Sequence, residues 1–367
     1  MIFIRAKERL AVLLCLLLAW TTACRAKDEL RLRGRLMVRY QIEDEERTSG
    51  RWTDTFTLHR IRLDGRWKLD ELRLNLELEA ADGLELADAY VRYDFFKQLR
   101  LSAGHFKKPL SRLHLTSRWD LVIPRRGMLD NLAVGQGMFG GYGGRDVGLM
   151  LWGRWGKKPR LEYYAGVFDG GSFLSWAFQD PQDPPGATNA SHRDYVGRLA
   201  ARFFRGLELG VSYGHKQAGI IYAPGEESRR YFNLVEGDLL WTVGDFSLQV
   251  EGAWGDNPNA MAGHKLAGGH ALVWYRQKLN DDLALLPALM VEYLDPDDAL
   301  SGGDAWRLAG ALNLDVGKHT RLVLAAEGGW GEYRFETPEY VTEKDLRAAQ
   351  KYRDVPLRVL MQLNVTL

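Results

Sequence analysis

The sequence predicts an all-β protein, a closed transmembrane antiparallel β-barrel of about 16 strands. Three observations lead to this class. Apolar and polar residues alternate along many segments, the segments are longer than ordinary globular strands, and tight turns alternate with longer connections. The chain has 367 residues, of which 46% are hydrophobic and 26% charged, and its net charge is +1. This composition would also suit a soluble domain, so the pattern decides the class.

The chain begins with a segment typical of a secretory signal. Basic residues precede an apolar run over residues 10–20, and small residues follow at 21–23. The run is too short to cross a bilayer as a helix. We therefore expect a signal peptide at 1–23, with cleavage as late as residue 26 as the alternative, and a single barrel at 24–367.

Both cysteines lie at this end of the chain. Cys15 falls inside the expected signal and Cys24 at its edge, so no disulfide is expected within the mature barrel. Cys24 follows Ala23 directly and is a candidate for lipid attachment, although Thr21 stands where such sites usually carry an apolar residue.

The alternation starts after this segment and continues to the last residue. Along 30–40, leucine, valine and tyrosine occupy one face and arginines the other, which fits a strand between lipid and water. No later stretch is apolar over roughly 18 residues, so membrane helices are excluded. The candidate strands lie near 30–43, 56–69, 72–81, 84–96, 99–110, 145–156, 160–171, 193–204, 207–218, 231–243, 246–257, 265–279, 284–296, 305–317, 320–333 and 356–367.

The connections alternate in length. Short turns are expected near 70–71, 97–98, 156–159, 205–206, 244–245, 280–282 and 317–319. Longer connections are expected at 44–55, 111–144, 172–192, 219–230, 258–264 and 334–355. Short periplasmic turns and longer outward loops are the plan of an outer-membrane barrel with both termini in the periplasm.

A secreted soluble β-sandwich, solenoid or lectin-like protein is the alternative, because its one-sided sheets would also alternate. Aromatic residues near strand ends, such as Trp67, Trp155 and Trp254, favour the barrel. In a barrel they would form girdles at the two membrane interfaces.

The connection 111–144 is the main functional candidate. It contains several arginines together with enough apolar residues to pack rather than remain disordered. We expect it to fold into the lumen as the third outward loop and to narrow the pore. The basic residues expected at this constriction are Lys107, Lys108, Arg118, Arg125 and Arg126.

The alternation also assigns charges to the lumen. In the first five strands it places basic pore residues at Arg60, Arg62 and Arg100 and a ladder at Arg31, Arg33, Arg35, Arg39, Arg66, Arg73 and Arg92. Acidic residues share this face at Asp64, Glu77, Glu79, Asp88 and Asp94. The later strands are mixed or slightly acidic, which predicts a transverse field across the pore. Ion pairs between loop arginines and wall carboxylates would cancel that field.

Several stretches resemble the phosphate-selective porin O and P family. The run Gly-His-Phe-Lys-Lys-Pro at 104–109 resembles the family's Gly-x-Phe-Lys-x-Pro strand, and 164–170 resembles its Gly-Val-Phe-Asn-Gly segment. Residues 302–324 resemble its penultimate hairpin and 357–363 its terminal strand. The order and spacing of these stretches over most of the mature chain make the resemblance specific.

The resemblance implies a homotrimeric porin in the lipid of the bacterial outer membrane that passes small anions such as phosphate along lumenal arginines and lysines. Two residues depart from the family pattern. Leu367 ends the chain where an aromatic is common, and Glu292 stands where family members often show Arg. The second departure argues against phosphate specificity.

Other functions are weighed against this one. A general or weakly selective porin with mixed lumen charge is the nearest alternative, and a barrel enzyme or an adhesin are the others. Ser111, His114 and Asp120 are the one set that resembles a catalytic triad. No catalytic, nucleotide or zinc motif is present, so no cofactor or metal is expected, and the interspersed charges disfavour nucleic acid.

Overall fold

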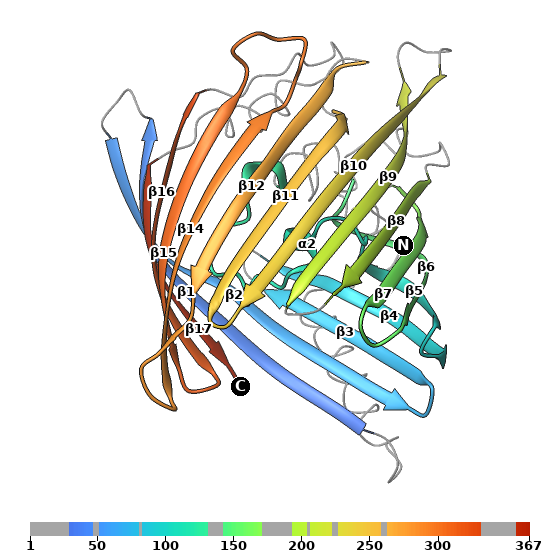
Figure 1. The fold of residues 1–367 in the computed structure, drawn as a ribbon, viewed down its shortest axis with the longest axis horizontal. Helices are drawn as coiled ribbons and strands as arrows, with labels where there is room; N and C mark the ends of the chain where they lie inside the picture. Colours follow the sequence, from blue (N-terminus) through green and yellow to red (C-terminus); the bar gives the residue numbers. More distant parts are fainter. Residues whose placement is uncertain are drawn as a thin grey trace, which may run out of the picture.

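The computed structural model contains one continuous antiparallel sheet. It describes residues 29–46, 51–80, 83–130, 142–170, 193–203, 206–221, 227–257, 263–331 and 357–367. Each strand is hydrogen-bonded to the next, and the last strand, β17 (Arg358–Thr366), pairs with the first, β1 (Glu29–Glu46). The sheet therefore closes into a barrel (Figure 1). The expected signal peptide, 1–23, lies outside the described residues.

The other strands follow in chain order. They are β2 (Arg51–Leu69), β3 (Leu72–Ala80), β4 (Leu84–Phe96), β5 (Leu99–Lys107), β6 (Arg145–Trp155), β7 (Arg160–Phe168), β8 (Asp194–Arg202), β9 (Leu207–Ile221), β10 (Glu227–Val243), β11 (Phe246–Asp256), β12 (Lys265–Tyr275), β13 (Gln277–Lys278), β14 (Leu283–Asp295), β15 (Ala305–Val316) and β16 (Thr320–Gly331). β12 and β13 both pair with β14, on either side of Arg276, and form one interrupted strand. The described barrel thus has 16 strands, which confirms the predicted class.

The alternation in the sequence corresponds to the two faces of the barrel. Large apolar side chains point outward, where Leu63, Leu199 and Trp254 are more than half exposed. Charged side chains such as Asp64 and Arg198 point inward and are buried. A soluble sandwich would show the reverse, so the outer face is that of a barrel surrounded by lipid.

Two of the connections are shorter than expected. Tight turns such as 70–71 agree with the prediction. However, β1 and β2 are separated only by 47–50 instead of 44–55, and β9 and β10 only by 222–226 instead of 219–230. These strands continue past their alternating parts because the hydrogen-bond ladder does not require apolar side chains where a strand leaves the lipid.

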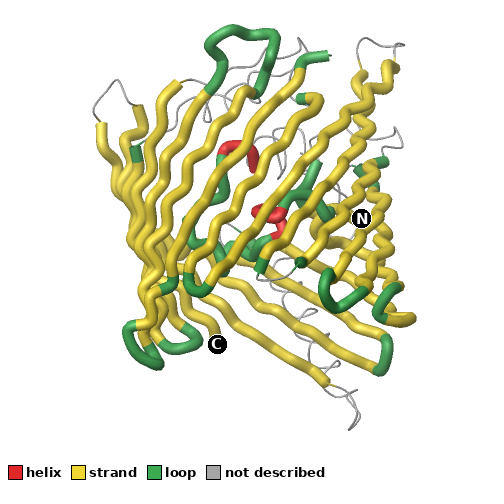
Figure 2. The backbone as a smooth tube through the Cα atoms, in the orientation of Figure 1, coloured by secondary structure: helices red, strands yellow, loops and turns green. Residues whose placement is uncertain are grey.

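The connection between β5 and β6 turns into the barrel. Its short helix α2 (Arg112–Leu115) lies inside the ring of strands, together with the adjoining loop segments (Figure 1 and Figure 2). Leu110 and Tyr142 join one buried apolar cluster with inward-facing wall residues, and Val122 and Ile123 join another. Residues 131–141 of the expected constriction loop lie outside the described residues. Among the described residues, no helix is long and apolar enough to cross a membrane.

Candidate pore constriction

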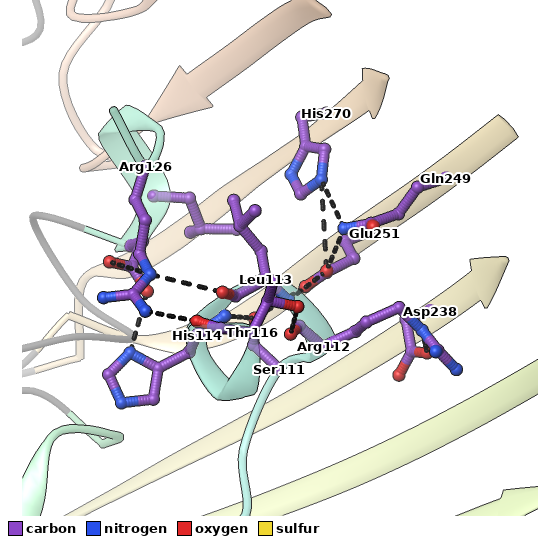
Figure 3. A network of polar contacts seen from close by, with 12 residues as sticks. Ser111, Arg112, Leu113, His114, Thr116, Arg126, Asp238, Gln249, Glu251 and His270 are labelled. Atoms are coloured by element: carbon purple, nitrogen blue, oxygen red, sulfur yellow. Dashed lines mark hydrogen bonds and ion pairs between the residues drawn. The ribbon is translucent and has the colours of Figure 1, made fainter. Parts of the chain in front are cut away.

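The start of the loop is held by a carboxylate on the inner wall. Glu251, on β11, accepts hydrogen bonds from the Ser111 hydroxyl at 2.6 Å and from the Leu113 backbone N–H at 2.5 Å (Figure 3). Gln249, on the same strand, donates to Glu251 at 2.8 Å. The Ser111 hydroxyl also accepts a bond from the His114 N–H at 3.1 Å, which caps α2. The first turn of α2 is thus fixed to the wall.

Arg112 strengthens the same attachment. Its Nε atom lies 2.7 Å from Asp238 on β10, and its Nη1 atom lies 3.0 Å from Glu208 on β9. The Asp238 side chain is fully buried, so this charge-assisted pair acts in a water-poor environment. The arginine therefore holds the loop and is not free to meet a solute.

The later part of the loop is attached to a different part of the wall. Glu292, on β14, accepts a hydrogen bond from the Leu129 N–H at 3.0 Å. Asn313, on β15, donates to the Val122 carbonyl at 2.9 Å. Val122 and its neighbour Ile123 are buried against inward-facing alanine, leucine, methionine and valine residues of β12 to β17. Apolar burial and directed hydrogen bonds therefore fix this segment together.

The loop also reaches the first strand. Arg35, on β1, donates to the Ser117 hydroxyl at 3.4 Å, and its guanidinium lies 5.3 Å from the ring centroid of Trp119. β1 lies across the barrel from β10 and β11, to which α2 is attached (Figure 1). A segment that contacts both walls crosses the lumen between them.

His114 connects distant parts of the loop through its two ring nitrogens. His114 Nδ1 lies 2.9 Å from Asp130, and the Gly144 N–H donates to His114 Nε2 at 3.0 Å. The acceptor role of Nε2 assigns the proton of the neutral ring to Nδ1. Burial lowers the pKa of His114 below its usual value, against the opposing effect of Asp130. Burial alone would raise the pKa of Asp130, but His114 and Arg126 lower it.

Arg126 connects the same parts of the loop. Its Nε donates to the Leu113 carbonyl at 3.2 Å and its Nη2 to the Thr116 carbonyl at 2.5 Å. Its Nε is also 3.9 Å from Asp130. The side chain is buried. This predicted constriction residue therefore links the α2 segment to the later part of the loop.

The two predicted lysines also form hydrogen bonds or ion pairs within the barrel. Lys107 Nζ donates to the His114 carbonyl at 2.8 Å. Lys108 Nζ lies 2.5 Å from Asp194 and 3.2 Å from Asp146, and all three of these side chains are buried. Both lysines thus join the loop to the wall.

The other two predicted constriction residues are placed differently. Arg118 and Arg125 are half-buried, and both lie close enough to Arg39 on β1 to interact with it electrostatically. Arg125 has one carboxylate partner, Glu327, at 3.4 Å, whereas Arg118 has no ion pair with any described residue. Burial and then the charge of Arg126 lower the pKa of Arg118 to about 10, so it remains cationic at neutral pH.

The charges of the predicted pore arginines and of the ladder are partly neutralised. Arg62 lies 2.8 Å from Glu77 and also pairs with Glu79, which pairs in turn with Arg60. Arg35 pairs with Asp64 and Arg31 with Glu29. Arg33 and Arg66 are exposed, and neither forms an ion pair with a described residue. Arg39 donates to Gln362 at 2.6 Å.

One carboxylate lies close to two arginines of the ladder and to one of the predicted pore arginines. Asp94 lies 3.0 Å from Arg73, 2.8 Å from Arg92 and 3.5 Å from Arg100. The guanidinium of Arg100 also lies 4.4 Å from the ring centroid of Trp152. This part of the wall therefore keeps an excess of positive charge.

Sequence reasoning missed how the acidic later strands are used. It treated the acidic residues of the later strands as pore charges, yet all four of the following are bonded to the loop or to an arginine: Glu251, Glu292, Asp238 and Glu208. An inward acidic position looks the same in the sequence whether it faces water or a backbone N–H. No local signal distinguishes the two cases.

The triad-like residues do not come together. The Ser111 hydroxyl donates to Glu251, and the His114 ring contacts Asp130 and Gly144, while Asp120 is exposed. Within the described part of the chain, no group of three or more His, Cys, Asp or Glu side chains could hold a metal ion.

Comparison with known families identifies the barrel. A family model described as phosphate-selective porin O and P matches residues 30–155. This match, together with the barrel, indicates an outer-membrane porin. The match covers β1 to β6 and the described part of the loop, so the resemblance is confirmed there, and it indicates a channel in the bacterial outer membrane rather than an enzyme. No curated protein sequence matches the porin.

Solved structures share the fold of the porin at low sequence identity. The outer membrane channel DcaP of Acinetobacter baumannii aligns with a TM-score of 0.57 and 11% identity, over 94% of this chain and 99% of that one. The trimer form of OmpT from Vibrio cholerae aligns with a TM-score of 0.54 and 13% identity, over 93% and 99%. OprB of Pseudomonas putida aligns with a TM-score of 0.54 and 9% identity, over 93% and 94%.

Proposed function

We propose that the porin passes small anions by passive diffusion, with phosphate among them. The observation that carries the proposal is the placement of Arg118 and Arg125 on the loop that crosses the lumen, near Arg39 on β1. In the described residues, Arg118 has no ion pair and Arg125 has only Glu327. A net positive charge at the narrowest part of a pore favours anions.

The chemistry of arginine suits this role. Its planar guanidinium donates two parallel hydrogen bonds and matches the geometry of phosphate or carboxylate. A conducting pore has to bind its ion weakly, or at several sites in series. Arg118 and Arg125, followed by the cluster of Arg73, Arg92 and Arg100 around Asp94, provide such a series.

A weakly selective porin is the second candidate. Arg60 and Arg62 pair with Glu77 and Glu79, so the charges of that wall nearly cancel. Wall charges that cancel would leave selectivity to the loop alone.

Reversal potentials across planar bilayers in a salt gradient test the proposal. We expect the wild-type porin to favour chloride over potassium and phosphate to compete for the pore. The double variant Arg118→Glu/Arg125→Glu should lose or reverse this preference. Lys157→Glu/Lys158→Glu, on an exposed turn, is the control for an equal reversal of charge away from the loop. A wild-type permeability ratio near one would support the weakly selective pore instead.

We also propose a trimer formed after removal of residues 1–23, with residues 24–367 as the barrel. The solved trimer form of OmpT, which shares the fold, supports the trimer. Native mass spectrometry of the purified porin and sequencing of its N-terminus test both statements, and the first detected residue distinguishes cleavage after 23 from cleavage after 26.

A further inference from the structure

We propose that Glu292 is a positioning residue that holds the constriction loop against β14, and that its carboxylate does not act as a charge of the pore. The inference rests on the proposed anion preference for its effect on selectivity. It explains why an acidic residue stands on the inner wall of an anion-preferring pore.

Both oxygens of Glu292 are occupied. The side chain is 1% exposed, Oε1 accepts the Leu129 N–H at 3.0 Å, and Oε2 lies 3.1 Å from Arg307 Nη1. A carboxylate without solvent contact whose charge is balanced by an adjacent guanidinium exerts little field on a passing ion. Its directed contact with the loop backbone is its remaining effect.

The loop backbone is shaped to fit this carboxylate. A Cβ atom at Gly127 would collide with the carboxylate of Glu292. The chain can therefore approach β14 this closely only because residue 127 has no side chain. The close approach is what brings the Leu129 N–H within hydrogen-bond distance.

The same carboxylate is linked to a constriction arginine. Arg307 bridges Glu292 and Glu327, with its Nη2 atom 2.5 Å from Glu327. Glu327 also contacts Arg125 at 3.4 Å and pairs with Arg358 of β17. Loss of Glu292 would free the 127–129 backbone and leave Arg307 to Glu327 alone, and so disturb the position of Arg125.

The two roles of Glu292 predict opposite results. If it were a pore charge, removal of its negative charge would increase anion preference. If it positions the loop, removal loosens the loop, so the conductance rises and the anion preference falls. Asp94 is the matched control, because it contacts Arg73, Arg92 and Arg100 and none of the loop, so Asp94→Asn should increase anion preference.

The experiment combines reversal potentials with limited trypsin digestion of the folded porin. In Glu292→Ala we expect cleavage at the loop arginines to become about tenfold faster, because a buried charge-assisted hydrogen bond to the loop is lost. Glu292→Gln should show a smaller effect, since its amide oxygen can still accept the Leu129 N–H. Gly127→Ala should resemble Glu292→Ala although it changes no charge.

Heat-modified electrophoretic mobility shows whether each variant retains a closed barrel, and Gly127→Ala tests the inference if Glu292→Ala does not fold. Cleavage rates equal to those of Asp94→Asn, or a rise in anion preference in Glu292→Gln as large as in Asp94→Asn, would overturn the inference. A wild-type porin without anion preference would instead overturn the proposed function, because the cleavage rates report the loop alone.

Discussion

Arg112 Nε lies 2.7 Å from the buried carboxylate of Asp238, and this ion pair joins the constriction loop to the inner wall of β10. The two residues are 126 positions apart in the chain. Their contact shows why the later strands carry acidic residues in a pore that we propose to favour anions. Those acids hold a basic loop, so much of their charge is neutralised before it reaches the aqueous path.

Removal of this ion pair should loosen the loop. Arg112→Ala or Asp238→Asn removes one of two ion pairs from the side chain that remains, because Arg112 also contacts Glu208 and Asp238 also pairs with Arg198. The cost should therefore lie below the roughly 3–5 kcal/mol of a buried charge left without any partner. We expect a noisier and larger single-channel current in each variant. The double variant should be disturbed less than the sum of the two, because both single variants remove the same contact. Additive effects would mean that the two side chains act separately.

The attachment of the loop should weaken in acid. The pKa of His114 is lowered by burial, so the unfolded or released loop binds a proton more readily than the docked loop. Stability that depends on the neutral ring is present above the usual histidine pKa of about 6.5 and is lost as the pH falls below it. The lowered pKa of Asp130 adds a loss in the same direction at lower pH.

Trypsin cleavage in the loop, divided by the rate for a short arginine peptide at the same pH, should therefore become faster as the pH falls from about 7.5 to 5.5, the window of histidine titration. Arg126 and Asp130, next to His114, keep their charge in this window, and a positive charge on Lys107 opposes the added proton. His114→Asn should reduce the difference between the two pH values. An unchanged pH dependence in this variant would assign the effect to another group.

Burial of apolar side chains should contribute as much to docking of the loop as the ion pairs do. Ile123 is buried in the cluster on β12 to β17, and Ile123→Ala should weaken docking of the loop by about 2–4 kcal/mol. The measurement is again cleavage of the loop in the folded porin. Leu115→Ala, at a partly exposed position of the same loop, is the control and should change little.

The free-energy cost of a charged side chain on the outer face should depend on its depth in the bilayer. Leu312 and Val316 both point outward on β15, at its centre and at its last residue. Leu312→Arg should destabilise the barrel by about 2–4 kcal/mol, and Val316→Arg by about 0–1 kcal/mol, because the penalty falls towards the interface. Folding titrations into liposomes measure both. Equal costs would mean that β15 does not cross the bilayer at this depth.

The sequence alone determined the barrel. The alternation of residues such as Leu63 with Asp64 is local, because successive side chains of a strand point to opposite faces. The strand number, the class and the inward loop follow from the repetition of that pattern, and the structure confirms the first two. The lengths of two connections were overestimated because a strand outside the lipid loses the alternation and keeps its hydrogen bonds.

Only the tertiary structure decided what the inward charges do. Glu251 and Glu292 meet the loop across 138 and 163 residues of chain, so no short-range pattern could distinguish them from free pore charges. Arg126 and Lys108 were predicted with Arg118 and Arg125 because all are basic and close in sequence. In the structure, Arg126 and Lys108 are buried and hydrogen-bonded or ion-paired, whereas Arg118 and Arg125 remain half-buried. Closure of the barrel brings distant charges together, and the pairs that form determine which cations are left to face the lumen.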